Sequence, residues 1–443
     1  MFWYSLIELD SLLSLILIIV YGLFSLRSVN IHLADVYFFC RLYPILFVLG
    51  YYIDSCATTF TLSIDILLAA LVFVIMYSFN SFESVLLLLF AFIGSYFMLH
   101  SVDLLTFYIA LEAQNFSFLV LCGLQSNKDS SSFSVEAALK YFLLSAFSSG
   151  VLLFWFSTIY LQTGCSVLSF SNSLESSPLQ TFMILTAMMF KLGAAPLHLW
   201  VVQIYSSVKR SLLMYISTAP KLSLFGFWVS SFHAVWTDFS VVLFAMFSIV
   251  LGSFGAYSQP ALRAVFAYST VNEIGLMLMA LETAGFSSLF QHLGIYIVSQ
   301  ILLWNLDDKR LFSVAAVSLA GLPPLAGFFG KAWIFWATIN ATGKNTTSAD
   351  VSSLTSYSNL YIVLMVALFC SGVSLVYYLR VLRLFWNNSQ GVNCRVIQFN
   401  RPRSVSISTV SAYMPLDSRV MLISTCVILL VFLPIFLIKP FVF

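Results

Sequence analysis

The chain is built almost entirely of apolar runs of about 20 residues, the length that an α-helix needs to cross the hydrocarbon core of a bilayer. Charged residues make up 9% of its 443 residues and hydrophobic residues 60%, whereas a globular chain carries about 25% charge. Inside lipid, only helices and closed barrels satisfy their own backbone hydrogen bonds. The sequence therefore predicts an all-α polytopic membrane protein.

We expect about fourteen transmembrane helices, joined mostly by very short loops. The predicted spans are 6–26, 37–54, 57–80, 82–100, 103–124, 135–162, 178–200, 211–235, 238–258, 262–282, 286–306, 311–340, 358–387 and 419–439. Two loops are longer than the rest, a Ser/Thr-rich one at 341–357 and a polar, basic one at 388–418.

Basic residues are concentrated on one side of the predicted membrane. When each loop is numbered by the span that it follows, the odd-numbered loops and their span ends hold fourteen of the twenty Lys and Arg residues. The even side holds only Lys344 and Lys439. By the positive-inside rule the odd loops face the cytoplasm-like side, so both termini face the opposite side.

Two predicted spans contain helix-breaking residues at matching places. Gly193 and Pro196 interrupt the seventh span, and the sequence GLPP at 321–324 interrupts the twelfth. Interrupted spans in corresponding positions are typical of transporters built from inverted repeats. We therefore expect two inverted five-helix repeats in which helices 7 and 12 are broken. The predicted parts are helices 1–3 at 1–81, the first repeat (helices 4–8) at 82–236, the inverted second repeat (helices 9–13) at 237–387, an odd-side loop at 388–418 and helix 14 at 419–443.

Four ionisable residues, Glu112, Lys191, Lys221 and Lys331, lie far from any predicted loop. At about 1.5 Å per residue they reach roughly the same depth in the membrane. A lysine at that depth costs roughly 3 kcal/mol on insertion scales, so such residues are usually functional. A row of buried acids and bases is the arrangement that proton transfer along the membrane plane requires. The alternative interpretation is a static buried ion pair that fixes helix packing.

Three further residues are weaker candidates for the same relay. His198 could pass a proton between Lys191 and the loop, or could hydrogen-bond the backbone that the break leaves free. Lys140 lies near a span end, where it could relay protons or extend to the interface. Glu273 is either a relay carboxylate or the partner of a polar neighbour, and His292 is interpreted as packing.

Motifs for redox or metal chemistry are absent from the sequence. The seven Cys residues form no C-x-x-C pair, which argues against iron–sulfur, zinc and c-type haem ligation. We find no Gly-rich phosphate-binding loop and no nucleophile elbow, and no basic patch with interleaved aromatic residues that would predict nucleic-acid binding. We therefore expect no cofactor, no metal and no nucleic acid to bind this chain.

Several stretches resemble the antiporter-like membrane subunits of respiratory complex I. The core likeness is FKLGAAPLHLW at 190–200 followed by APKLSLFG at 219–226. Similar segments are FYIALEAQNFSFLVL at 107–121, EAALKYFLLSAFSSG at 136–150, QPALRAVFAYSTV at 259–271, LAGLPPLAGFFGKAWIF at 319–335 and LVYYLRVLRLFW at 375–386. Within that family, the lysine at 331, the sixth-span sequence and the absence of a long C-terminal lateral helix are most similar to the mitochondrial subunit 2 branch.

The resemblance implies a proton-translocating membrane-arm subunit of NADH:ubiquinone oxidoreductase. It implies that neighbouring membrane-arm subunits flank the chain on both sides, that lipids surround it, and that NADH, FMN, iron–sulfur clusters and ubiquinone bind other subunits. We expect the chain to lie in the mitochondrial inner membrane, with its odd-numbered loops in the matrix and both termini on the intermembrane-space side. The carried-over relay consists of the pair Glu112–Lys191, the connecting Lys221 and the exit or entry Lys331, with His198 and Lys140 at relay positions.

The sequence also departs from the family pattern. Arg263-Ala264 replaces the usual basic pair, and Glu273 stands where His or Gln is common, which alters the charge balance between Lys221 and Lys331. Two alternatives remain open, a subunit of a stand-alone cation/proton antiporter and a non-pumping structural subunit of complex I.

Overall fold

The fold is known from a computed structural model of the chain. It describes residues 16, 20, 40–48, 59–79, 81–124, 131–167, 178–232, 239–305, 309–323, 325–344 and 351–387.

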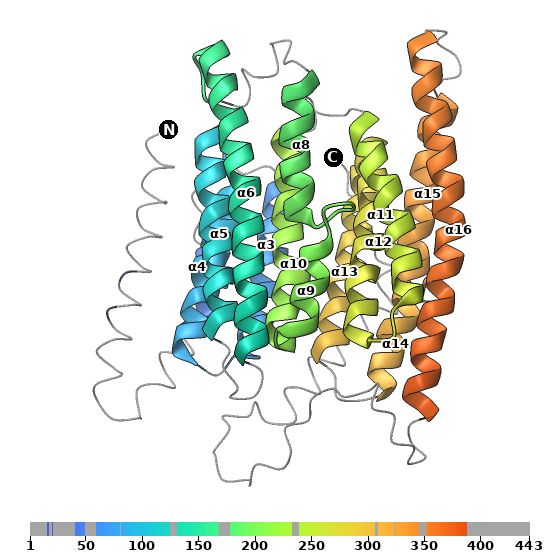
Figure 1. The fold of residues 1–443 in the computed structure, drawn as a ribbon, viewed down its shortest axis with the longest axis horizontal. Helices are drawn as coiled ribbons and strands as arrows, with labels where there is room; N and C mark the ends of the chain where they lie inside the picture. Colours follow the sequence, from blue (N-terminus) through green and yellow to red (C-terminus); the bar gives the residue numbers. More distant parts are fainter. Residues whose placement is uncertain are drawn as a thin grey trace.

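All named elements in the described part of the chain are helical, as predicted. They are α3 (Thr59–Met76), α4 (Phe82–Leu99), α5 (Leu104–Leu124), α6 (Ser131–Thr163), α8 (Pro178–Leu192), α9 (Leu199–Ser207), α10 (Arg210–Phe227), the π-helical turn η1 (Trp228–Phe232), α11 (Phe239–Ser258), α12 (Leu262–Glu282), α13 (Phe286–Asn305), α14 (Lys309–Ala320), α15 (Ala326–Lys344) and α16 (Val351–Asn387). Figure 1 shows them standing side by side in an elongated slab, with α4–α6 near one end and α15 and α16 at the other.

Among the described residues, eight helices are long and apolar enough to cross a membrane, and the shorter apolar helices α3 and α8 accompany them. These helices coincide with predicted spans. The spans predicted at 6–26 and 419–439 lie outside the described residues, apart from positions 16 and 20, and the span at 37–54 is described as helix only at 40–48. The predicted total of fourteen therefore stays a prediction.

Both predicted interruptions are present. The seventh span divides into α8 and α9, which are separated by residues 193–198, and the twelfth divides into α14 and α15, which are separated by 321–325. Gly193 and Gly321 have φ angles of 79° and 81°, a region that side-chain-bearing residues rarely adopt. Each break therefore begins at a glycine directly after a half-helix.

Two predicted boundaries were wrong. The seventh span was expected to end at 200, but α9 continues to Ser207, because the chain starts a new half-helix after the break. The loop expected at 341–357 is much shorter, since α15 runs to Lys344 and α16 begins at Val351. The segment 351–357 contains neither Gly nor Pro, so nothing in its composition stops the helix from extending.

The interior of the slab is formed by α10 and α12. In these helices 89% and 94% of the apolar stretch is buried inside the protein, compared with 33% in α6 and α16. Helix α10 packs against α3, α4, α5, α8 and α13. Large apolar side chains on α6 and α16, such as Phe147 and Phe369, are instead exposed. Central helices are therefore shielded from lipid on all sides, whereas α6 and α16 present apolar faces outward.

Arg263 ties the first turn of α12 to the end of α9. Its guanidinium donates hydrogen bonds to the backbone oxygens of Ser206 at 3.2 Å and Val208 at 2.9 Å. These carbonyls lie at the C-terminal end of a helix, where orphan acceptors need partners. One arginine therefore fixes a joint between the two halves of the chain.

We predict that Arg263→Ala lowers the free energy of unfolding by roughly 1.5–3 kcal/mol, the usual contribution of hydrogen bonds to a charged group. The measurement is thermal unfolding of the detergent-solubilised protein. Arg383→Ala, at an exposed position on α16, is the matched control and should change the midpoint little. Equal midpoints for both variants would contradict the assigned role.

Candidate functional site

The first buried pair joins α5 to α8. The Lys191 ammonium lies 3.6 Å from Oε1 of Glu112, and their side chains are 3% and 19% exposed. Lys191 also donates to the backbone oxygen of Ser145 on α6 at 3.4 Å. The same oxygen of Glu112 accepts a long hydrogen bond from the Asn115 amide, at 3.4 Å. The acid and the base predicted to work together are thus ion-paired.

The break in the seventh span positions this lysine. Lys191 lies in the last turn of α8, where the helix dipole favours a positive charge. Beyond it the Ala195–Pro196 peptide bond is cis, and the Trp200 indole donates to the Phe190 backbone oxygen at 3.0 Å. The same carbonyl, in the last turn of the helix, also accepts from the Gly193 backbone N–H at 3.0 Å. The half-helix can therefore stop inside the protein without exposing its backbone to lipid.

Lys221 lies on α10, in the middle of the slab. Its ammonium donates a 2.8 Å hydrogen bond to the Tyr296 hydroxyl of α13 and lies 4.8 Å from the centre of the same ring. Pro220 precedes it inside the helix. Tyr296 is fully buried, so this lysine is held by a neutral hydroxyl and an aromatic face rather than by a carboxylate.

A cavity lies between Lys191 and Lys221, and both lysines line it. Its polar lining residues include Gln114, Tyr141 and Tyr215, and the Gln114 amide donates to the Tyr215 hydroxyl at 3.5 Å. The volume open to the centres of water molecules is about 40 Å³. By the same measure one water molecule needs about 10–15 Å³. A few water molecules therefore fit between the two lysines.

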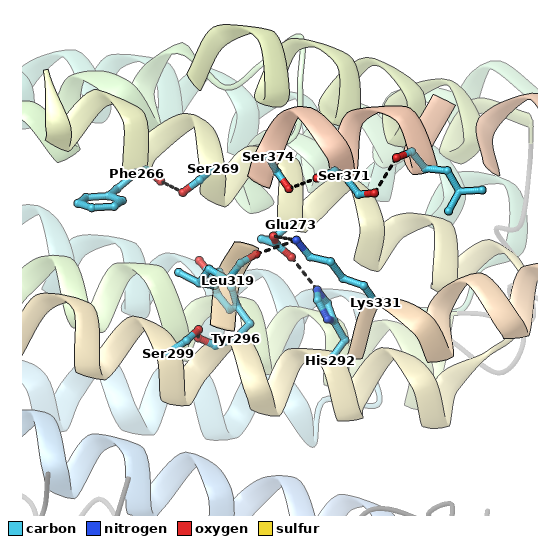
Figure 2. A network of polar contacts seen from close by, with 11 residues as sticks. Phe266, Ser269, Glu273, His292, Tyr296, Ser299, Leu319, Lys331, Ser371 and Ser374 are labelled. Atoms are coloured by element: carbon cyan, nitrogen blue, oxygen red, sulfur yellow. Dashed lines mark hydrogen bonds and ion pairs between the residues drawn. The ribbon is translucent and has the colours of Figure 1, made fainter. Parts of the chain in front are cut away.

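The second buried pair joins α12 to α15, and Figure 2 shows it from close by. The Lys331 ammonium lies 3.1 Å from Oε1 of Glu273, and the two side chains are 6% and 1% exposed. Lys331 also donates to the backbone oxygen of Leu319 at 2.7 Å. Leu319 is in the last turn of α14, so this lysine, like Lys191, is held at the C-terminal end of a half-helix. At Gly321 a Cβ would lie 3.2 Å from the lysine side chain.

A third residue, His292, contacts the carboxylate of this pair. Nε2 of His292, on α13, lies 2.8 Å from Oε2 of Glu273, and the imidazole is 3% exposed. The prediction that Glu273 partners a polar neighbour agrees with this contact, whereas the interpretation of His292 as simple packing was wrong. An ionisable residue in an apolar span, four residues before Tyr296 on the same helix, was the signal available in the sequence.

The two weaker candidates, His198 and Lys140, are placed apart from the buried lysines. His198 is buried at the start of α9, with its ring 5.5 Å from that of Tyr268. Lys140 is half-exposed on α6 and forms an ion pair with Glu136, four residues earlier, at 2.6 Å. Within the described residues, no ion pair joins either of them to the relay. Their relay roles remain predictions, and the position of Lys140 fits the alternative of extension to the interface.

The sequence-based predictions did not include several tyrosines and one amide that lie at the site. Tyr141, Tyr215 and Gln114 line the cavity, and Tyr296 holds Lys221. The chain contains 21 tyrosines, so their number gives no signal. A polar amide inside an apolar span was the signal available for Gln114. Among the described residues no cluster of three His, Cys, Asp or Glu side chains could hold a metal ion.

Comparison with known proteins identifies the family. The family described as NADH:quinone oxidoreductase/Mrp antiporter, TM, matches residues 101–306. The chain is 48% identical over 436 residues to NADH-ubiquinone oxidoreductase chain 2 of Chlamydomonas reinhardtii, which covers 98% of this chain and 100% of the relative. The chain belongs to the NADH-ubiquinone oxidoreductase chain 2 family. The resemblance to complex I subunits and to their subunit 2 branch is thereby confirmed.

Solved structures share the chain 2 fold. A chain of respiratory complex I from Thermus thermophilus with bound aureothin aligns with a TM-score of 0.72 at 24% identity, over 96% of this chain and 98% of that one. A chain of the Mrp complex from Dietzia sp. DQ12-45-1b aligns with a TM-score of 0.62 at 18% identity, over 73% and 66%. At these identities the likeness establishes a common antiporter-like fold.

We predict that Lys191→Met lowers the free energy of unfolding by roughly 1.5–3 kcal/mol, because it leaves the partly buried Glu112 carboxylate without its cation. The double variant Glu112→Gln/Lys191→Met should recover most of the loss, since it leaves no unpaired charge. The measurement is thermal unfolding in detergent. Lys140→Met removes only a half-exposed lysine and should change stability by roughly 0.5 kcal/mol or less. A double variant no more stable than Lys191→Met would contradict a net interaction within the pair.

Proposed function

We propose that this chain is a proton-translocating membrane-arm subunit of NADH:ubiquinone oxidoreductase, complex I, in the mitochondrial inner membrane. The observation that carries the proposal is the row of buried groups from Glu112 through Lys191 and Lys221 to Lys331, in a chain 48% identical to NADH-ubiquinone oxidoreductase chain 2 of C. reinhardtii. Electron transfer takes place in other subunits, which bind NADH, FMN, iron–sulfur clusters and ubiquinone. This chain moves protons.

The Glu112–Lys191 pair acts as the first switch. A buried charge is unfavourable without a counter-charge, so moving or protonating the Glu112 carboxylate promotes proton release from Lys191. The Glu112 side chain is 19% exposed and has the flexibility to leave the pair. The cavity beside Lys191 then carries the proton on its water molecules toward Lys221.

Lys221 passes the charge toward the second half of the chain. Its bond to the Tyr296 hydroxyl reaches α13, and that helix packs against both α10 and α15. Lys331 of α15 is the group through which protons leave or enter the second half-channel. Each proton moved against 100 mV stores about 2.3 kcal/mol.

The finer architecture belongs to the same proposal. Fourteen helices, with inverted repeats at 82–236 and 237–387, bring the two broken helices to equivalent places. The matrix holds the odd-numbered loops, including 388–418, and both termini face the intermembrane space. The outward apolar faces of α6 and α16, at opposite ends of the slab (Figure 1), support partner subunits on both sides, with lipid on the remaining surface.

A stand-alone cation/proton antiporter is the second candidate, because the matched family includes Mrp antiporters. Native electrophoresis of mildly solubilised membranes separates the two functions. If the chain migrates with NADH-oxidising activity at high mass, the complex I assignment stands. If it migrates in a smaller assembly without that activity, sodium and potassium exchange become the functions to assay.

We predict that Glu112→Gln leaves assembly intact but lowers NADH-driven proton uptake by about tenfold or more, since an amide cannot exchange a proton. Purified complex in liposomes, with a pH-sensitive dye and parallel NADH oxidation, provides the measurement. Glu136→Gln, at a side chain 56% exposed, is the control. Normal assembly with an unchanged proton-to-electron ratio would instead support the non-pumping structural role.

We predict that Tyr296→Phe slows coupled turnover roughly tenfold, because it removes a hydrogen bond to a charged group while keeping the ring. Steady-state NADH oxidation and proton uptake in the same liposomes provide the measurement. Tyr361→Phe, which removes a hydroxyl from a side chain 44% exposed on α16, is the control. Wild-type rates in Tyr296→Phe would show that the Tyr296 hydroxyl takes no part in the proton path.

A further inference from the structure

The Glu273 carboxylate is shared by two bases on different helices. Oε1 faces Lys331 at 3.1 Å and Oε2 faces Nε2 of His292 at 2.8 Å. All three side chains are buried, with exposed fractions of 6% or less. Figure 2 shows Glu273 between the two bases. The first pair differs, because the other neighbour of Glu112 is a neutral amide, that of Asn115.

Hydrogen-bond chemistry fixes the form of the imidazole. An ionised carboxylate only accepts hydrogen bonds, so Nε2 of His292 carries a proton and donates it to Glu273. In the neutral imidazole the free lone pair is then on Nδ1. Among the described residues, Nδ1 of His292 is buried without a hydrogen-bond partner. The second nitrogen is therefore available to accept a proton.

A glycine of the neighbouring helix lies against that nitrogen. Gly330 of α15 directly precedes Lys331, and a Cβ at Gly330 would lie 2.8 Å from Nδ1 of His292. Any larger residue would crowd the imidazole at the atom that can take a proton. Helix α15 thus supplies both the lysine on one side of Glu273 and, at Gly330, the space that the imidazole occupies on the other.

We propose that Glu273 and His292 form a second, cation-exchanging switch, in which His292 gains a proton at Nδ1 as Lys331 releases one from Nζ. The proton that binds Nδ1 comes from the Lys221 ammonium, where an N–H bond breaks, and the proton released from Lys331 leaves through the second half-channel. The carboxylate stays ionised throughout. One positive charge faces Glu273 before and after the exchange. The buried carboxylate is therefore never left without a cation, which would be strongly unfavourable.

The position of His292 connects this switch to the preceding lysine. Tyr296 lies four residues further along α13, so the two side chains are neighbours on one face of the helix. Tyr296 bonds Lys221 at 2.8 Å and His292 bonds Glu273 at 2.8 Å. The inference rests on the proposed function and extends it, because it assigns the step between Lys221 and Lys331 to residues of α12 and α13.

The deciding variant is His292→Gln in the purified complex, reconstituted in liposomes. The glutamine amide can still donate a hydrogen bond to Glu273 but cannot bind a proton. We expect native assembly and a decrease of at least about tenfold in NADH-driven proton uptake, with partial recovery in His292→Lys, which restores a proton-binding group. Ser288→Ala, one turn earlier on α13, is the control, because among the described residues its hydroxyl donates to the backbone oxygen of Gly285, just before its own helix.

Wild-type uptake in an assembled His292→Gln complex would overturn the proposal. If that variant does not assemble, Gly330→Ala is the deciding variant, because it crowds Nδ1 of His292 while keeping every titratable group. Reduced proton uptake would then support the switch, and normal uptake would overturn it. Glu112→Gln in the same assay distinguishes a failure of the His292 switch from a failure of the proposed function. If Glu112→Gln blocks pumping and His292→Gln does not, only the switch fails, and if neither has an effect, the proposed function fails.

Discussion

The structure depends on one constraint, the compensation of positive charge buried at bilayer depth. Each of the three lysines is held differently: Lys191 by a carboxylate, Lys221 by a hydroxyl and a ring, and Lys331 by a carboxylate and a carbonyl. Two of these arrangements require a helix to end inside the protein, because an ended helix offers free carbonyls and the negative end of its dipole. The ends of the broken helices thus stabilise the charges of the two lysines that lie beside them.

The links between these groups are of two kinds. Lys191 and Lys221 are separated by a cavity large enough for a few water molecules. In the second half the contacts are direct, with His292 and Lys331 both packed against Glu273. Water in the first half adjusts readily to either charge state of the lysines. In the second half the charged groups contact one another directly, so their charge is balanced by the side chains themselves.

The sequence predicted the components better than their pairing. Lysines within apolar runs are rare enough to identify Lys191, Lys221 and Lys331, and Gly and Pro located both breaks. It did not predict His292 as a partner, because a lone histidine in an apolar span is equally consistent with packing. Nor did it predict the cavity, which depends on how α5, α6, α8, α9 and α10 pack. Depth counted from span ends cannot tell which face a residue occupies. For Lys140, which lies near a span end, both alternatives were open, and it is half-exposed.

The difference between the two carboxylates explains why one chain would need both types of switch. Glu112 is partly exposed, on a helix with 44% of its apolar stretch buried, whereas Glu273 is 1% exposed on a helix with 94% buried. A partly exposed carboxylate can separate from its lysine because other polar groups and water can receive it. A fully enclosed one cannot move without leaving a charge in a low-dielectric interior. For Glu273 the remaining way to release Lys331 is to exchange the cation, and His292 is the base in contact with its second oxygen.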